Sequence, residues 1–482
     1  MEEENRKSRG RIMSLKKISP VSVVGTRGYF NENKRLDMYF VHPEKIEALE
    51  HLNRVANSRN FDTVGLEEVL KLPVEKGSGI KEDVGDNYAI VPGCLTSDFL
   101  VDLQKASRSP NYPSRKQLQN EDILLLADAH SEGYIGKNNS MVILRSDEKA
   151  VYIGHLIRLR PDQCKIDSFY LLAYMNFPDI RLLLQYSVRG QTVGLYPNDI
   201  RNLPIILPQR GIQISIGDKL KQSIEKKTEA EKKKKEIDEV FNKYLPMDFE
   251  MPSNVSYTYD KKESHIINRR LDPHFYHPKY RYVTKLINQA EVQKRNLEDL
   301  VSFSKSTFNP EKLGEQKFKY VEIDNINLAY GYIESHSEMV GKKAPSRARK
   351  LLKESDLLIP LTRPYRGAVA VVDAFYNDCI GTTGFSVSQS KLKDVDTYYI
   401  CAFLKTKFGI MQLGQRMSNA NYPAVIESNL RDILVPILPN SERLKISSYM
   451  ESILSFSRES QSLHQQAMSE LGGLLSFNEV ES

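Results

Sequence analysis

Two nine-residue segments of this sequence place a histidine and a proline close to an arginine and an aspartate. They are RLDMYFVHP at 35–43 and RLDPHFYHP at 270–278. An imidazole near a carboxylate can transfer protons, so one hypothesis is a duplicated catalytic cluster. The alternative is structural, because proline fixes the backbone φ angle and polar side chains cap the element that follows. We favour the structural interpretation, in which the framework residues are Arg35, Asp37, His42, Arg270, Asp272 and His277.

The sequence motifs of common catalytic and cofactor sites are missing. GYIGKN at 133–138 has the wrong spacing for a phosphate-binding Walker loop, and GSG at 77–79 lacks the third glycine of the dinucleotide fingerprint. The NYP strings at 111–113 and 421–423 do not supply the Asn/Asp-Pro-Pro-Tyr/Phe motif of amino-methyltransferases. No G-x-S-x-G elbow occurs, and the four cysteines form no C-x-x-C pair. We therefore predict no catalytic residue, no metal site and no cofactor bound by this chain.

Several segments combine basic side chains with planar ones. Two pairs of such segments are SRSPNYPSRK at 107–116 with GKKAPSRARK at 341–350, and SVRGQTVGLY at 187–196 with RMSNANYPAV at 416–425. TRPYRG at 362–367 follows an apolar run. Arginine suits phosphate and the edge of guanine, asparagine and glutamine suit adenine, and tyrosine offers an amphipathic ring. Each residue taken alone could equally be a solvated loop side chain, but as sets these segments favour contact with nucleic acid.

The candidate DNA-contacting residues fall into one group in each half of the chain. Those of the first half are Arg108, Tyr112, Arg115, Lys116, Arg189, Gln191 and Tyr196. Those of the second half are Lys342, Lys343, Arg347, Arg349, Lys350, Arg363, Arg366, Arg416, Asn419, Asn421 and Tyr422. Because the two groups differ, they are expected to read different base sequences if they read DNA.

The two halves also carry the same segments in the same order. Beyond the opening segments, three pairs match: SRKQLQNEDILLL (114–126) with ARKLLKESDLLIP (348–360), DSFYLLAY (167–174) with DTYYICAF (396–403), and IRNLPIILP (200–208) with LRDILVPILP (430–439). This conserved order predicts a tandem duplication of a unit of roughly 200 residues. A period this long indicates two domains rather than a solenoid.

Each copy begins with a helical pattern and continues with short β-branched runs. In the first copy, PEKIEALEHLNRV is typical of a helix, whereas DILLLA and YIGHLIRL are typical of strands. In the second copy, KYRYVTKLINQAEVQ is followed by DLLIPL and GAVAVVDAF. Glycine, proline and asparagine separate the runs, as they do in loops. These patterns predict a mixed α/β (α+β) fold for each copy.

A long helix is predicted at the end of each copy. Apolar residues at spacings of three and four form one stripe, such as Ile216, Leu220 and Ile224 in the first helix. Because both helices occupy the same place in the repeat, we favour their pairing; the alternative is that each packs only on its own domain. The predicted segments are a charged N-terminal segment (1–20), a first domain (21–208), a central helix (209–246), a linker (247–268), a second domain (269–439) and a C-terminal helix (440–477).

The composition is that of an ordinary globular protein, with 40% hydrophobic and 27% charged residues. No apolar run reaches the length of about 18 residues needed to cross a membrane, and the charged N-terminus lacks the apolar stretch of a secretory signal. We therefore expect a cytoplasmic protein with no membrane partner. The formal net charge of +6 is compatible with binding to nucleic-acid phosphates but does not require it.

These motifs resemble those of the specificity (S) subunits of type I restriction–modification systems. The shared features are the RLD-x-x-Phe/Tyr-x-x-Pro opening, the acidic strand start Glu/Ser-Asp-Ile/Leu-Leu, and the Leu-Pro end before a long helix, all present twice. The helix entrances depart from the family pattern. Ile212 stands where an acidic residue is typical, and Ile446 lies one residue closer to the preceding Leu-Pro. Residue roles at the two helix entrances are therefore not carried over from the family.

The resemblance implies two pseudo-symmetric target-recognition domains, each of which reads one half of a split, asymmetric site in double-stranded DNA. It implies that the two long helices join the domains as an antiparallel coiled coil, which sets the spacer. Such a chain is not an enzyme. It recruits two methyltransferase (M) subunits, which flip and methylate adenine with S-adenosylmethionine, and restriction/translocase (R) subunits, which use ATP and Mg²⁺.

Two alternatives stay open. A related subunit could serve a type II enzyme, whose partner fuses methylase and nuclease in one chain, and this sequence does not separate the two. A coiled-coil scaffold that never touches bases is an alternative from another class. It would bind without regard to DNA sequence, whereas the other two hypotheses require a bipartite site.

Overall fold

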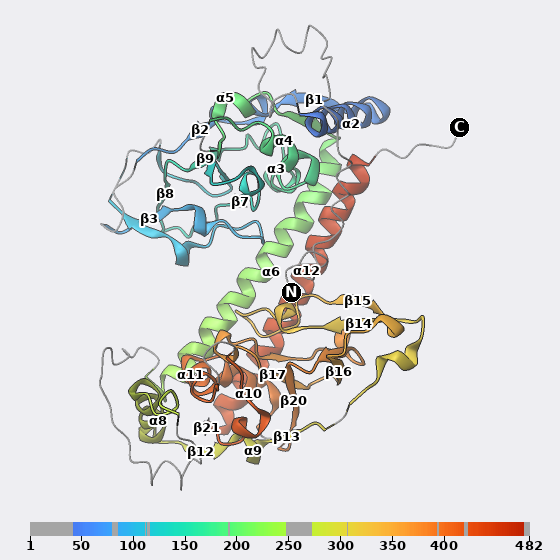
Figure 1. Ribbon diagram of the computed structural model, residues 1–482. Coiled ribbons are helices and arrows are strands. Elements are labelled where there is room, and N and C mark those ends of the chain that lie inside the picture. The colour runs from blue at the N-terminus through green and yellow to red at the C-terminus, as the bar shows by residue number, and fades with distance from the viewer. Residues whose placement is uncertain are drawn as a thin grey trace. The chain divides into compact units, whose positions relative to one another are not determined.

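The computed structural model describes residues 42–79, 85–110, 112, 116–190, 193–246, 272–305, 307–392, 395–418 and 423–476. Its internal contacts divide the chain into two compact units: unit 1 comprises residues 1–224 and 462–482, and unit 2 comprises residues 225–461. The division falls inside two long continuous helices, α6 (Arg210–Asn242) and α12 (Asn440–Leu475) (Figure 1). Each unit therefore contains one part of both helices. The charged segment 1–20 and the predicted linker 247–268 lie outside the described residues.

Unit 1 has a mixed α/β fold built from short strands. One sheet has the antiparallel order β2 (Glu75–Lys76), β9 (Leu156–Leu159), β5 (Ile123–Leu126), β7 (Ser140–Met141). A second sheet has the order β4 (Ser107–Ser109), β3 (Asn87–Ile90), β8 (Ala150–Tyr152), in which β3 and β8 are parallel. Two antiparallel ladders join β1 (Asp62–Gly65) with β11 (Pro204–Leu207) and β6 (Asp128–Ala129) with β10 (Val193–Gly194). The helices besides α6 and α12 are α2 (Pro43–Arg59), α3 (Ser168–Met175), α4 (Pro178–Gln185) and α5 (Pro197–Ile200).

Unit 2 repeats this topology. One sheet has the antiparallel order β13 (Val301–Phe303), β20 (Phe385–Ser390), β17 (Leu357–Pro360), β18 (Ala370–Val371). The other has the order β15 (Ser337–Val340), β14 (Lys317–Val321), β19 (Ile380–Thr382), β16 (Ala348–Leu351), with β14 and β19 parallel. A ladder joins β12 (Gln293–Asn296) with β21 (Leu434–Ile437). The helices are α8 (Pro278–Gln289), α9 (Leu297–Leu300), α10 (Thr397–Leu404) and α11 (Lys407–Gln415).

Short 3₁₀ helices connect these elements. In unit 1 they are η2 (Leu66–Val69), η3 (Pro92–Cys94), η4 (Leu103–Lys105) and η6 (Glu132–Tyr134). In unit 2 they are η8 (Pro310–Leu313), η9 (Ile323–Asn325), η10 (Gly341–Lys343), η11 (Pro364–Arg366), η12 (Ala374–Tyr376) and η13 (Glu427–Leu430). The mixed α/β fold predicted from the sequence is confirmed, and so is the repetition of its elements.

The buried helices α3 and α10 show why the repeated segments DSFYLLAY and DTYYICAF fold alike. Each begins after an aspartate, Asp167 or Asp396, whose carboxylate caps the first backbone N–H groups. A tyrosine near the helix start then anchors the helix to the last strand of its unit. The Tyr170 hydroxyl donates to the Ile206 carbonyl at 2.8 Å, and the Tyr399 hydroxyl donates to a strand carbonyl at 2.7 Å. Burial of these phenols raises their pKa well above the usual value, so both remain donors.

The parts of α6 and α12 that lie in one unit are paired. In unit 1, Lys219 forms a 2.7 Å ion pair with Glu470, and the apolar stripes of both helices enter the core. In unit 2, residues that ascend along α6 meet residues that descend along α12, so the pairing is antiparallel. These contacts are Lys226 with Glu459 at 3.0 Å, Lys233 with the Tyr449 ring at 4.2 Å, and Lys243 with Glu442 at 3.2 Å. The same stripes also pack on strands and helices of each unit, so both packing modes occur together.

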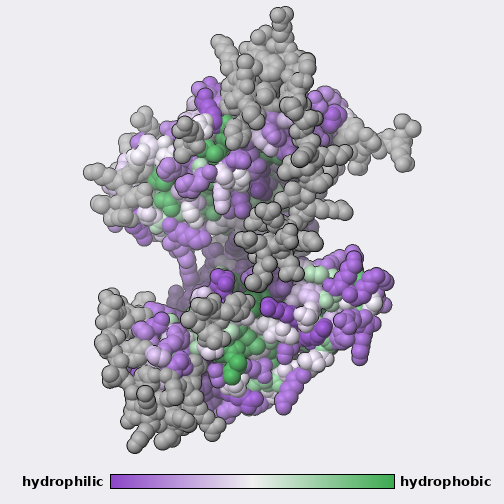
Figure 2. Space-filling view, in the orientation of Figure 1, coloured by the Kyte–Doolittle hydropathy of each residue, from purple (hydrophilic) through white to green (hydrophobic). Residues whose placement is uncertain are grey.

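The described surface in view in Figure 2 is mostly hydrophilic on each unit, with small hydrophobic patches. The apolar residues of the predicted strands lie inside instead; Ile123, Leu124 and Leu125 of β5 and Leu357, Leu358 and Ile359 of β17 are fully buried. Among the described residues, no helix combines the length and apolar character needed to cross a membrane.

Candidate nucleic-acid interface

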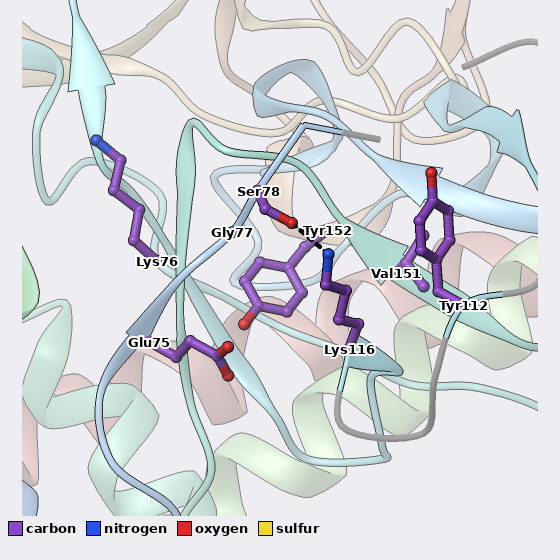
Figure 3. A pocket seen from close by; sticks show the side chains of 8 residues that line it. All are labelled: Glu75, Lys76, Gly77, Ser78, Tyr112, Lys116, Val151 and Tyr152. Carbon is purple, nitrogen blue, oxygen red and sulfur yellow. Dashed lines mark hydrogen bonds between the residues drawn. The ribbon is translucent and has the colours of Figure 1, made fainter. Parts of the chain in front are cut away.

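The first basic segment of unit 1 contributes to a small cavity (Figure 3). The cavity has a volume of about 280 Å³ and is lined by Glu75, Lys76, Gly77, Ser78, Tyr112, Lys116, Val151 and Tyr152. The Lys116 ammonium donates to the Ser78 hydroxyl at 2.7 Å and lies 5.5 Å from the centre of the Tyr112 ring. Gly77 is required here because a Cβ would lie 2.1 Å from the Ile153 carbonyl oxygen. A cation, two phenol rings and a hydroxyl thus meet in one concave surface.

Lys76 connects this cavity to the second basic segment of unit 1. Its side chain points away from Lys116 in Figure 3 and forms a 2.7 Å ion pair with Asp128. The Lys76 ammonium also lies 4.8 Å from the centre of the Tyr196 ring, and the Arg189 guanidinium lies 4.7 Å from the same centre. Tyr196 remains 39% exposed. Arg189 also forms a 3.1 Å ion pair with Asp199. The half-exposed ring can present an aromatic face to a base beside two cations that carboxylates already hold in place.

We call this set of residues site 1: Lys76, Tyr112, Lys116, Arg189 and Tyr196. The backbone explains why its two segments converge. Residues 128–129 of β6 pair with residues 193–194 of β10, which brings the Arg189–Tyr196 loop beside Asp128. Asp128 in turn holds Lys76 and accepts from the His155 ring at 3.0 Å.

In unit 2, three of the basic segments meet around residues 383–384. The Thr383 N–H donates to the Arg347 carbonyl at 2.7 Å, and the Leu361 N–H donates to the Gly384 carbonyl at 2.7 Å. The Arg363 N–H donates to the Pro423 carbonyl at 2.8 Å, which joins the third segment to the second. The sequence separates these segments by tens of residues, but the end of β17 and the corner after β19 place them together.

We call this set site 2: Arg347, Arg349, Arg363 and Arg366. Arg347, Arg363 and Arg366 are exposed. Within the described residues, no hydrogen bond or ion pair engages their three guanidinium groups, and Arg349 donates only to the adjacent Ala348 carbonyl, at 3.2 Å. Arg363 has a left-handed backbone with φ of 47°, which is costly for a residue with a side chain. Several exposed arginines on one rim form a site suited to a polyanion.

A comparison with protein families finds a match that includes most of the first copy. Residues 59–239 match the family described as "Type I restriction modification DNA specificity domain". Over these residues the chain is similar to the DNA specificity domain of type I restriction–modification systems. The match confirms the resemblance that the sequence motifs indicate, and the residues of site 1 lie within the matched range.

Three solved structures show likeness over most of the chain. The S subunit of a type I restriction–modification system from M. genitalium is 13% identical with a TM-score of 0.47, covering 88% of this chain and 98% of that one. The HsdS subunit from Thermoanaerobacter tengcongensis is 14% identical with a TM-score of 0.26, covering 86% and 96%. A third structure, which concerns complex assembly and conformational transition of the type I R-M system, is 14% identical with a TM-score of 0.29. The match covers 86% of this chain and 97% of that one. No curated protein matches this sequence.

Arg416 was predicted among the DNA-contacting residues, and its position argues against that role. The residue is 5% exposed. Its guanidinium donates to the Asp432 carboxylate at 2.8 Å, to the Asp432 carbonyl at 2.8 Å and to the Gln412 carbonyl at 3.0 Å. A guanidinium with its donors satisfied inside the fold cannot reach a base without breaking these bonds. We therefore remove Arg416 from the candidate set.

Four other candidates outside sites 1 and 2 lie among the described residues and are exposed or partly exposed: Arg108, Lys342, Lys343 and Lys350. Arg108 lies 4.5 Å from the Tyr88 ring centre and donates to the Asp86 carbonyl at 3.0 Å. Lys342 pairs with Glu315 at the surface, and Lys343 and Lys350 lie near it in sequence, on η10 and β16. Arg115, Gln191, Asn419, Asn421 and Tyr422 lie outside the described residues.

The described residues of the opening segments lie at helix starts, and the His277 and Asp272 side chains cap backbone N–H groups there, whereas the His42 side chain makes no capping hydrogen bond. His42 is the N-cap of α2, and its ring stacks on Tyr186 with centres 4.0 Å apart. His277 is the N-cap of α8, and its ring accepts the Lys279 N–H at 3.2 Å. Asp272 accepts a backbone N–H three residues later. These contacts support the structural interpretation over a duplicated catalytic cluster. Arg35, Asp37 and Arg270 lie outside the described residues.

Sequence reasoning missed three residues that organise site 1: Lys76, Asp128 and His155. Asp128 follows the strand that the motif DILLLA predicts, and a strand end is where functional side chains gather, so this signal could have been used. Lys76 and His155 meet Asp128 only through the pairing of β2, β9 and β5, which the sequence does not reveal. In the described part of the chain, no group of three or more His, Cys, Asp or Glu side chains could hold a metal ion.

Proposed function

We propose that this chain is the DNA sequence-specificity subunit of a type I restriction–modification complex, in which units 1 and 2 each read one half of a bipartite, asymmetric DNA site. The observation that carries the proposal is the match of residues 59–239 to a DNA specificity domain. Unit 2 repeats the strand order of that domain, including one parallel pair in the corresponding sheet. Two copies of one reading domain support two half-sites.

The chemistry of the two sites supports different half-site sequences. Site 1 combines a tyrosine ring with two cations, Lys76 and Arg189, so it offers stacking and phosphate contacts. Site 2 offers arginines with open donor groups, which suit the O6 and N7 acceptors of guanine in the major groove and the phosphates beside it. Corresponding rims of one fold thus present different donors, as two readers of unlike sequences require.

We propose that the chain itself does no chemistry on DNA. Its role is to bring two methyltransferase subunits, which supply S-adenosylmethionine chemistry, and restriction/translocase subunits, which supply ATP- and Mg²⁺-dependent chemistry, to one DNA sequence. Sites 1 and 2 fit this division of labour because their described side chains are cations, phenols and hydroxyls suited to contact. The helices α6 and α12 are proposed to serve as the spacer between the half-sites.

The test is to co-express the chain with its methyltransferase subunit in a host without adenine methylation and to map N6-methyladenine by single-molecule sequencing. We expect methylation at one motif made of two short specified parts around an unspecified spacer. Methylation at a single contiguous motif, or without sequence preference, would contradict the proposal. The latter result would instead favour a scaffold that never reads bases.

A chain carrying Lys285→Met serves as the matched control, because Lys285 is an exposed cation on α8 that belongs to neither site. It should give the wild-type motif. If the partner that restores methylation also cleaves DNA as part of one polypeptide, the chain serves a type II enzyme, and the bipartite reading stands while the partner assignment changes.

A further inference from the structure

Lys405 ties together two loops of unit 2, one of which carries site 2. It is the C-cap residue of α10 and is partly buried. Its ammonium donates to the Leu328 carbonyl at 2.9 Å and to the Gly367 carbonyl at 3.3 Å. One side chain therefore joins the loop 327–331 to the turn 363–367, which contains Arg363 and Arg366. Among the described residues, no strand ladder engages these two carbonyls, and the ammonium is the donor that they share.

The turn 363–367 needs such an anchor at its end. Its start is fixed, because the Arg363 N–H donates to the Pro423 carbonyl at 2.8 Å. Inside it, the Arg366 N–H donates to the Arg363 carbonyl at 3.0 Å, and the Gly367 N–H donates to the Pro364 carbonyl at 3.0 Å. Both Arg363 and Gly367 have left-handed backbones, with φ of 47° and 73°. A strained non-glycine residue persists only where the surroundings hold it, and Lys405 supplies that hold at Gly367.

The loop 327–331 is shaped around the lysine stem. The Asn327 side chain accepts the N–H groups of Ala329 and Tyr330, both at 3.0 Å, and the Gly331 N–H donates back to the Asn327 carbonyl at 3.0 Å. Gly331 has φ of 76°, and a Cβ at this position would lie 2.7 Å from Cδ of Lys405. Glycine at 331 is thus required by its positive φ, and a Cβ there would also press on the Val369 carbonyl and the Lys405 stem.

Unit 1 holds the corresponding loop from the corresponding position, but with a neutral group. Asn176 is the C-cap of α3, and its amide donates to the Asn139 carbonyl at 2.9 Å and accepts the Asn139 N–H at 3.1 Å. Asn139 immediately precedes β7, as Val369 precedes β18 in unit 2. The position after the buried helix therefore anchors the same loop in both units, through an amide in one and an ammonium in the other.

We propose that Lys405 is a positioning residue that fixes the turn 363–367 so that site 2 can bind DNA, and that its charge makes DNA binding by unit 2 sensitive to pH. This proposal rests on the proposed function of site 2. It assigns Lys405 no contact with DNA, because its ammonium is already committed to two backbone carbonyls. It also distinguishes the two units, since the Asn176 amide does not titrate.

The surroundings of Lys405 set the pH at which its charge is lost. Burial lowers the pKa of Lys405 to about 8, the Cys401 side chain on the same helix raises it, and the Lys234 ammonium of α6 lowers it. Lys234 is itself paired with Asp238 at 3.1 Å. An amine is a weaker donor than an ammonium, so the anchor weakens as the pH rises through about 8.

The sign of the stability effect is opposite to that of binding. The folded-state pKa is lower than the unfolded value, so between the two values the unfolded chain holds the proton and the folded chain does not. In that window this group contributes added stability as the pH rises. A loss of DNA binding above pH 8 would therefore occur without unfolding driven by Lys405, which separates a positioning role from a purely structural one.

The experiment uses the full chain and a duplex carrying the mapped bipartite site, at one stated salt concentration. Lys405→Met is expected to weaken binding at pH 7 by about tenfold, with lost discrimination at one half-site only, and to remove the decline between pH 7 and 9. Lys405→Asn, which copies unit 1, should recover binding to within about threefold with a flat pH profile. Lys285→Met should keep both the affinity and the wild-type profile.

A second measurement needs no DNA. Hydrogen exchange at pH 7 should show the Arg366 and Gly367 amides exchanging faster in Lys405→Met than in the wild type, with the amides near Asn139 unchanged. If these amides stay protected, or if Lys405→Met binds DNA with the wild-type pH profile, the positioning role is wrong. If the amides loosen but even the wild type ignores DNA sequence, positioning stands and the proposed function falls.

Discussion

The two units keep one buried aspartate at the same place but surround it differently. Asp122 of unit 1 and Asp356 of unit 2 each precede the central strand of their sheet and accept the N–H three residues earlier, at 2.8 and 2.7 Å. Asp122 also forms two 2.7 Å hydrogen bonds with the guanidinium of buried Arg160. The strand register places Gln389, an exposed neutral residue, where unit 1 has Arg160. Both units thus keep the hydrogen bond from the backbone to the aspartate, but the residue opposite the aspartate differs.

This difference shows which parts of the duplicated domain are constrained. The backbone cap is local, so it needs only the aspartate and survives any change elsewhere. The charge of that aspartate must still be stabilised, and the groups around it differ between the two units. Burial alone would lower the pKa of Arg160, but the hydrogen bonds and charge of Asp122 outweigh it and raise that pKa. Burial raises the pKa of Asp356, which has no such cation. The surroundings of sites 1 and 2 also differ at a corresponding position, because Asp128 of unit 1 corresponds to Thr362 of unit 2.

The largest expected effect comes from removing the aspartate charge in each unit. Asp122→Asn leaves the Arg160 cation buried without its counter-charge and should cost about 3–5 kcal/mol of unfolding free energy. Asp356→Asn keeps an acceptor for the backbone N–H and removes a charge that no buried guanidinium binds, although the Lys353 charge acts on it, so it should cost about 1 kcal/mol or less. Chemical denaturation followed by circular dichroism measures both. Adding Arg160→Gln to Asp122→Asn should recover part of the loss. Equal losses for the two single variants would mean that the partner does not matter.

The next largest effect concerns DNA binding and tests whether the two units read their half-sites independently. Arg363→Ala and Arg349→Ala should each weaken binding by about 1–3 kcal/mol if the side chain meets a base, and by less if it meets only phosphate. Methylation mapping should then show relaxed sequence at one half-site, with the other unchanged. Relaxation of both halves would contradict independent readers. Lys285→Met controls for the loss of one positive charge.

Much of the architecture follows from the sequence because it rests on local patterns that occur twice. The strands at 123–126 and 357–360 are apolar runs after an aspartate, and both are buried as predicted. The long helices α6 and α12 follow from apolar spacing of three and four. A pattern that recurs in the second copy is an independent repetition of the evidence, which is why these elements could be predicted without a structure.

The sites were harder to predict because they depend on the direction of each side chain. Arg416 and Arg363 look alike in the sequence, yet one guanidinium is satisfied by Asp432 inside the fold and the other is exposed. Lys76 was missed because only the register of short strands brings it to Asp128. Non-local pairing of this kind leaves no periodic signal, so loop composition alone does not show which of these side chains are exposed and which are buried.

A smaller effect is expected from the backbone of the turn at Arg363. Its left-handed conformation costs a residue with a Cβ roughly 1–2 kcal/mol, and glycine avoids that cost. Arg363→Gly should therefore be more stable to unfolding than Arg363→Ala by about 1 kcal/mol, although both lose the same guanidinium. The corresponding residue of unit 1, Ala129, lies in strand β6. There Ala129→Gly should lose about 0.5–1 kcal/mol instead. If glycine changed the free energy of unfolding in the same direction at both positions, the turn at Arg363 would not be strained.

The smallest expected effect is the pH dependence of stability carried by Asp356. Burial raises the folded-state pKa of Asp356 above the ordinary aspartate value of 3.8, so the folded chain binds this proton more tightly than the unfolded chain. The contribution of the group to stability is therefore greatest at low pH and falls as the pH rises from 3.8 through the folded pKa. Asp356→Asn removes this dependence. Relative to the wild type, the variant should gain in melting temperature between pH 4 and pH 7, by a few degrees at most. If the difference in melting temperature between Asp356→Asn and the wild type stayed constant over this pH range, the neighbours of Asp356 would stabilise its charge as well as Arg160 stabilises that of Asp122. The contrast between the units would then lie only in sites 1 and 2.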